Sequence, residues 1–164
     1  MSNELSIRVR TLVERVMGVY EAIEVMVRHG GDVGMYVKSV LAEVIDEYVR
    51  ASGSNAPINE YLSMLRSVDA VHNYVEASGA GRFVPRGTRY LAERLVSAYE
   101  AGGVLSMFNE CVGYLGQSDV LARVPDGERA LYELVDIHRT CFKIIIDPLL
   151  DALYMRGGHA PVPK

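Results

Sequence analysis

The stretch that decides the fold is GERALYELVDIHRTCFKIIIDPLLDALYMR, residues 127–156. Its apolar residues recur at spacings of three and four, which places them along one face of a helix. The members of this face are Leu131, Leu134, Val135, His138, Cys141, Phe142, Ile145, Leu149, Ala152 and Leu153. We therefore expect one long buried helix, with Asp126 as its N-cap and Gly157 and Gly158 at its C-terminal end.

The second half of this stretch has two further features. Pro148 lacks an N–H, so it predicts either a kink or the start of a second helix at this point. Residues 141–150 are also apolar on nearly every side, because Ile144, Ile146 and Leu150 lie off the main face. Such a helix is buried either within its own domain or against another subunit. The second explanation predicts self-association, and burial of these three residues within one chain would remove its basis.

The composition indicates which classes of protein the chain can belong to. The chain has 164 residues, of which 49% are hydrophobic and 23% charged, as expected for one globular domain. We expect that domain to span residues 1–156, followed by a flexible tail of residues 157–164. A net charge of −4 argues against a generally basic nucleic-acid binder. No uncharged apolar run approaches the ~18 residues of a membrane helix, and no signal peptide is recognisable, so we expect no membrane partner.

Cysteine and arginine usage indicate the setting of the protein. Cys111 and Cys141 each fall in an apolar helical pattern, which predicts buried thiols rather than a disulfide or a metal motif. Free thiols predict an intracellular location, or a virion if the protein is a coat subunit. Arginine outnumbers lysine fourteen to three and glutamine is rare. This bias fits a thermophile, and equally a GC-rich genome.

The rest of the chain predicts further helices and no convincing strand. We expect them at about 4–29, 33–51, 57–78, 88–101 and 104–115, with a weak helical stretch at 119–123; most are separated by glycine pairs or loops. The fold class is therefore all-α, a single-domain bundle of five to seven helices around a long, proline-kinked C-terminal helix.

The first of these helices has an unusually regular apolar pattern. It repeats every seven residues, through Leu5, Val9, Leu12, Val16, Val19, Ile23 and Met26. A seven-residue repeat is typical of a bundle core face and also of a helix that pairs with another chain. A helical adaptor that binds a partner helix through residues 5–26 is therefore one alternative function.

The segment 79–94 is the best candidate for a ligand site. Arg82 and Arg86 lie among glycines just before a predicted helix N-terminus, and neither has an acidic residue four positions away. Arg89 follows, and Phe83 could stack on a base or pack in the core. The segment predicts a nucleic-acid or polyanion contact at Arg82, Phe83, Arg86 and Arg89, with a solvated or salt-bridged loop as the alternative.

One spacing resembles a catalytic pattern. Arg66 and His72, in RSVDAVH, fit the Arg-x(4–6)-His spacing of the all-helical HEPN-type ribonucleases, a loose pattern that an arginine-rich chain can contain by chance. The resemblance would imply a small ribonuclease in which this pair contacts the scissile phosphate. His72 and His138 otherwise fit satisfied core histidines.

No complete motif for a nucleophile, a metal or a cofactor is recognisable, so we expect none of these. The leading hypothesis is a non-catalytic structural or assembly protein that self-associates as a homo-oligomer. It would suit a nucleoprotein or helical coat subunit that contacts nucleic acid through the arginine-rich loop.

Overall fold

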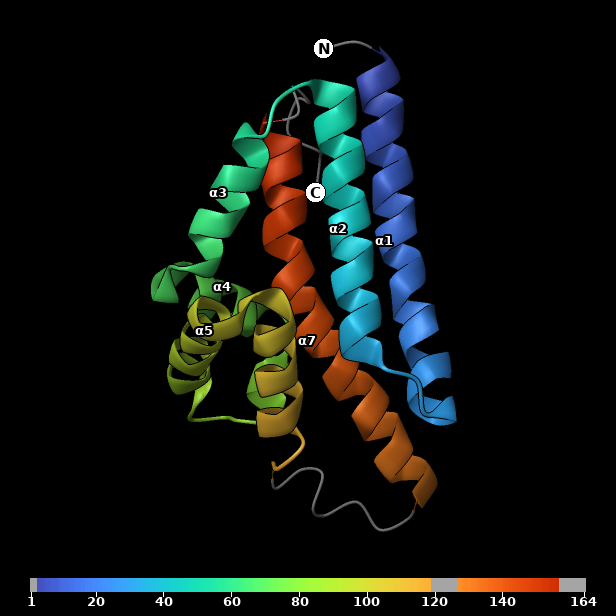
Figure 1. The fold of residues 1–164 in the computed structure, drawn as a ribbon. Helices are drawn as coiled ribbons and strands as arrows, with labels where there is room; N and C mark the ends of the chain where they lie inside the picture. Colours follow the sequence, from blue (N-terminus) through green and yellow to red (C-terminus); the bar gives the residue numbers. More distant parts are fainter. Residues whose placement is uncertain (1–2, 119–126, 157–164) are drawn as a thin grey trace.

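The long C-terminal helix lies at the centre of the fold in a computed structural model, which describes residues 3–118 and 127–156 (Figure 1). This helix, α7 (Gly127–Arg156), packs against each of the other five α-helices of the described residues. Those helices are α1 (Asn3–His29), α2 (Val33–Ser52), α3 (Ala56–Leu65), α4 (Val68–Ala77) and α5 (Thr88–Leu115). The prediction of an all-α bundle is confirmed for the part of the chain that the structure describes.

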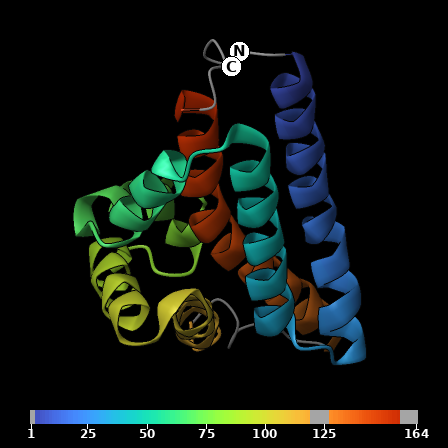
Figure 2. The same cartoon turned by 45° about the horizontal axis from the view of Figure 1, so that its top comes forward.

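The helices lie on two sides of α7. Helices α1 and α2 form an antiparallel pair on one side, and α3, α4 and α5 lie on the other (Figures 1 and 2). Asp32 is the N-cap of α2, because its side chain accepts a hydrogen bond from the Met35 amide at 3.1 Å. Gly53 ends α2 in the left-handed conformation, with φ of 69°.

The apolar half of α7 is buried inside this single chain. Ile144 and Ile146 are 1% and 0% exposed, and Leu150 is partly buried against the same core. The two charged residues of this half, Lys143 and Asp147, form an ion pair at 3.0 Å. The apolar surface of residues 141–150 therefore has an explanation within one domain, and it no longer indicates a contact between subunits.

Helix α7 continues through Pro148 as one element. Proline cannot donate the backbone hydrogen bond that a helix needs at this point. Nearby, the buried Tyr61 hydroxyl donates to the Ile145 carbonyl at 3.1 Å, and burial raises the pKa of Tyr61. The predicted kink is not confirmed. The predicted caps Asp126, Gly157 and Gly158, the weak helix at 119–123 and the tail 157–164 lie outside the described residues.

One expected helix is divided in the structure, and one expected break is present. The expected helix 57–78 is wrong, because the chain breaks into α3 and α4 at Arg66 and Ser67. Ser67 has extended backbone and its hydroxyl accepts from the Ala70 amide at 3.2 Å, which makes it an N-cap. The expected break between 101 and 104 is present within α5, where Gly103 has φ of 78° and ψ of −161°.

The cysteine prediction is also wrong. Cys111 of α5 and Cys141 of α7 form a disulfide, with 5.8 Å between their Cα atoms. Both residues are buried, so the apolar pattern around each was interpreted correctly while their pairing was missed. The intracellular location inferred from free thiols loses its basis.

The predicted core face of the first helix is present. Val9, Leu12, Val16, Val19 and Ile23 are all 6% exposed or less. The stripe that motivated a partner-helix adaptor is therefore used within the bundle. No helix among the described residues combines the length and apolarity needed to cross a membrane.

Candidate functional site

The arginine-rich segment connects α4 to α5. Helix α4 ends at Ala77, and Gly79 then turns the chain with φ of 86°, a conformation that favours glycine. A short 3-10 helix, η1 (Ala80–Arg82), follows, and α5 begins at Thr88. Ala80 and Phe83 are 0% and 3% exposed, so they hold the segment against the core while the arginine side chains point outward.

Arg82 is held by α7. Its guanidinium forms ion pairs with Glu133 and Asp136 of that helix and lies 4.7 Å from the centroid of the Phe83 ring. Phe83 packs in the core, which was the alternative to base stacking, so its ring is not available to a nucleic-acid base. Arg82 links the segment to the central helix.

Arg89 and Arg86 differ in their surroundings. Arg89 donates to Asp69 of α4 at 2.7 Å, and both side chains are largely exposed. Arg86 is exposed and forms no ion pair with any residue that the structure describes. Of the three predicted anion-binding arginines, two already have carboxylate partners from other helices, and Arg86 alone has none among the described residues.

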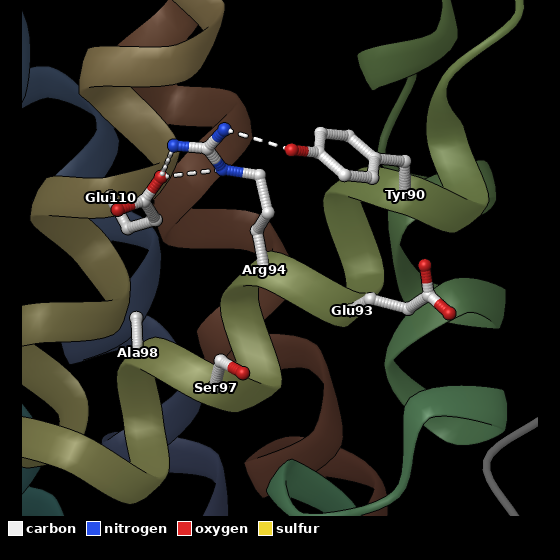
Figure 3. Close-up of a pocket in the computed structure, with 6 residues that line it drawn as sticks. All are labelled: Tyr90, Glu93, Arg94, Ser97, Ala98 and Glu110. Carbon is white, nitrogen blue, oxygen red and sulfur yellow. Dashed lines mark hydrogen bonds and ion pairs between the residues drawn. The ribbon is translucent and has the colours of Figure 1, made fainter.

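A polar cluster on α5 surrounds Arg94 (Figure 3). Its Nε and Nη2 atoms donate to Glu110 Oε2 at 2.8 and 2.6 Å, and Nη1 donates to the Tyr90 hydroxyl at 3.3 Å. The guanidinium also lies 5.6 Å and 5.0 Å from the ring centroids of Tyr90 and Tyr114. Hydrogen bonding to Glu110 raises the pKa of Arg94.

A depression of about 480 Å³ borders this cluster, and Figure 3 shows its lining residues. They are Tyr90, Glu93, Arg94, Ser97, Ala98 and Glu110. Arg94 and Glu110 form an ion pair, and Glu93 adds a second carboxylate to the lining of the depression. Its chemistry favours no particular class of small molecule.

Arg66 and His72 have separate surroundings. Arg66 lies 6.0 Å from the Tyr99 ring centroid and lines a depression of about 540 Å³ with Tyr99, Glu100 and Gly103. His72 is not among these lining residues. Its Nε2 atom lies 3.1 Å from Glu76 Oε1 and 3.3 Å from Thr88 Oγ1. The contacts of the two residues thus assign them to different clusters.

The His72 cluster was not foreseen from the sequence. It joins a hydroxyl, an imidazole and a carboxylate, the three groups of a catalytic triad. In a triad the hydroxyl and the carboxylate bind opposite ring nitrogens, whereas Thr88 and Glu76 both approach Nε2 of His72. The Thr88 hydroxyl also donates directly to Glu76 at 2.6 Å. This arrangement does not activate the hydroxyl, and it joins α4 to the first turn of α5.

His138 is a half-buried histidine of α7. Its Nδ1 atom lies 2.7 Å from the Leu134 carbonyl, and its ring lies 6.1 Å from the Phe108 ring. Burial lowers the pKa of His138, which favours the neutral ring. No group of three or more His, Cys, Asp and Glu side chains within residues 3–118 and 127–156 is placed to hold a metal ion.

Sequence reasoning missed the partners of the arginines rather than the arginines themselves. The two carboxylates that bind Arg82 lie 51 and 54 residues away along the chain. The carboxylate that binds Arg94 lies 16 residues away. The i, i+4 rule finds partners on the same helix and cannot find these.

No protein family, curated protein or solved structure matches this chain. The surface and the contacts of the chain itself are therefore the basis for inferring its function.

Proposed function

We propose that this chain is a non-catalytic structural protein that self-associates. The observation that supports this is the outward face of α1. Within the described residues six large hydrophobic side chains are exposed, and Ile7, Met17 and Val25 of α1 are three of them, at 59%, 57% and 59%. The other three, Met35, Tyr90 and Tyr132, lie one each on α2, α5 and α7. Burying apolar surface is favourable, so a helix with this outer face gains from a protein contact.

The proposal differs from the expectation in its location. The sequence pointed to residues 141–150 as the contact surface, and the apolar residues of this range are buried or partly buried within the chain. The buried stripe of α1 is likewise used internally. The opposite face of α1 supports self-association, and this surface is neither residues 141–150 nor the buried stripe of α1.

Analytical ultracentrifugation across a wide range of protein concentration tests the proposal. We expect the weight-average mass to rise with concentration toward that of a dimer or a larger assembly. A mass that stays at the monomer value of 18.1 kDa throughout would contradict self-association.

Contact with nucleic acid, as in a nucleoprotein or coat subunit, is a second part of the proposal. Its support is limited to Arg86, because Arg82 and Arg89 already have carboxylate partners. Arg86 precedes the first turn of α5, whose free N–H groups favour an anion.

Fluorescence anisotropy with a single-stranded oligonucleotide tests this second part. Binding should weaken in Arg86→Glu and show a smaller salt dependence. Lys38→Glu, the same charge change on α2, is the matched control. Equal binding by the two variants would remove Arg86 from the proposal, and no binding by the unmodified protein would remove nucleic acid altogether.

A further inference from the structure

We propose that the outward face of α1 docks on α1 of a second copy of the chain, antiparallel, about a twofold axis near residue 16. This inference rests on the proposed self-association and specifies its geometry. Three observations carry it: the line of exposed residues on α1, an arginine with no ion pair among the described residues, and a glycine where a side chain would have open space.

The exposed residues form a continuous line. Ile7, Glu14, Gly18, Glu21 and Val25 follow one another at intervals of seven, four, three and four residues, so they share one face. All five are exposed, and they lie opposite the buried stripe that contains Val16. Helix α1 lies at the edge of the bundle beside α2 and α7, which leaves this face open among the described residues (Figures 1 and 2).

The charges on this face favour one orientation. Three arginines of α1 have ion pairs: Arg8 with Glu47, Arg15 with Glu43, and Arg28 with both Glu24 and Glu128. Arg10 forms no ion pair with any described residue, and it lies on the same flank of the line as Glu21.

An antiparallel twofold that relates residue 7 to residue 25 brings Arg10 of each copy beside Glu21 of the other. A parallel twofold would instead place the two copies of Arg10 on opposite flanks of the contact. Neither copy would then lie beside Glu21, which is 11 residues, about 16 Å, away along the helix axis. Arg10 and Glu21 are therefore complementary to each other in the antiparallel orientation.

The apolar residues agree with this register. In the antiparallel pair Ile7 of each copy meets Val25 of the other near the two ends of the contact. Met17 lies close to the axis, so the two copies of its side chain meet near the middle. The same patch on both subunits makes the contact, as a twofold interface requires.

Gly18 lies near the axis, in a helical position where a side chain would not clash with the rest of the monomer. A Cβ atom added there would meet nothing within 4 Å. Glycine in a helix interior costs about 1 kcal/mol relative to alanine, so this position lowers the stability of α1 without a packing reason within the chain. Between two paired helices the missing side chain allows the axes to approach more closely.

Charge exchange tests the orientation. Arg10→Glu and Glu21→Arg should each raise the dimer dissociation constant at least about tenfold, which corresponds to about 1.4 kcal/mol. The double variant Arg10→Glu with Glu21→Arg should restore dimerisation, because it restores both pairs with reversed sign. Lys38→Glu is the control for net charge, and circular dichroism checks that each variant is folded.

Cross-linking tests the register without relying on energies. In the antiparallel pair a mixture of the single variants Ile7→Cys and Val25→Cys should form an intermolecular disulfide, whereas each variant alone should not. Cross-linking of either variant with itself would indicate a parallel contact and overturn the inference.

Gly18→Leu gives an independent check. The new side chain has open space in the monomer, so the protein should fold normally and dimerise less. A protein that dimerises fully despite Arg10→Glu and Gly18→Leu would overturn the α1 contact while leaving self-association intact. A protein that is monomeric at every concentration would overturn both.

Discussion

The conformation of Gly103 divides α5 into two halves. Its φ of 78° and ψ of −161° lie in a region that residues with a side chain rarely adopt. Gly103→Ala should therefore lower the free energy of unfolding by about 1 to 3 kcal/mol. Chemical denaturation monitored by circular dichroism measures this change.

Gly113 is the matched control on the same helix. A Cβ atom there would meet nothing within 4 Å, and its backbone is helical. Gly113→Ala should raise stability by up to about 1 kcal/mol through helix propensity alone. If Gly103→Ala and Gly113→Ala changed the free energy of unfolding in the same direction, the backbone at Gly103 would not be strained for alanine.

His138 should make stability depend on pH. Burial lowers its folded-state pKa, while in the unfolded chain the imidazole has its ordinary pKa near 6.5. Above that pH both states hold a neutral ring and His138 contributes no difference. As pH falls below it, the unfolded state binds a proton first, so the free energy of unfolding decreases until the folded-state pKa is reached.

The measurement compares His138→Gln with the unmodified protein from pH 7.5 downward. The difference between their unfolding free energies should change below about pH 6.5, the ordinary pKa of histidine. Parallel curves through this range would mean that His138 titrates alike in both states.

Among the elements, the link between the η1 segment and α7 depends on Arg82. Its two carboxylate partners and its contact with Phe83 make it the best-held arginine of the segment, although it is about half exposed. Arg82→Gln should lower stability by about 1 kcal/mol or less for each ion pair, as partly exposed pairs contribute. Arg86→Gln, which removes no ion pair among the described residues, should have little effect.

A double-mutant cycle with Glu133→Gln separates the ion pair from other effects of Arg82→Gln. A coupling energy near zero would show that the contact with Glu133 contributes nothing to the position of the segment.

The elements also show what the sequence could and could not predict. The stripes of α1 and α7 were predictable because a helical face is a local pattern. The break between α3 and α4 was missed because Leu65 and Val68 continue the apolar spacing across it. Ser67 was the available signal, as a residue that commonly caps a helix.

The partners of the arginines show the limit of such patterns. Glu24 and Arg28, four residues apart, form an ion pair at 3.1 Å, which is the kind of pair that spacing along one helix can predict. Arg50 has an acidic residue at the same spacing, Asp46, yet it pairs with Glu47. Pairs between helices, such as Arg82 with Glu133, depend on how helices pack and have no local signal.

For the whole molecule, the disulfide joins the central helix to α5. Closing a loop between cysteines 30 residues apart should contribute about 3 to 4 kcal/mol to stability by restricting the unfolded chain. The paired variant Cys111→Ala with Cys141→Ala should therefore unfold at a lower temperature. Its melting temperature should be unaffected by a reducing agent, whereas that of the unmodified protein should fall when the bond is reduced.

The disulfide could not be predicted from the pattern of either helix alone. Each cysteine lies on an apolar helical face, which indicates burial and nothing about a neighbour. Their pairing requires that α5 and α7 pack side by side in one register. That information belongs to the whole fold rather than to either helix.

The bond between Cys111 and Cys141 also closes the intervening chain into a covalent ring. A protease that cuts one peptide bond inside this ring opens it without separating the two products. The nicked protein should migrate as one species on a denaturing gel without reductant and as two fragments after reduction. The polypeptide can thus be cleaved between these cysteines and still be a single molecule.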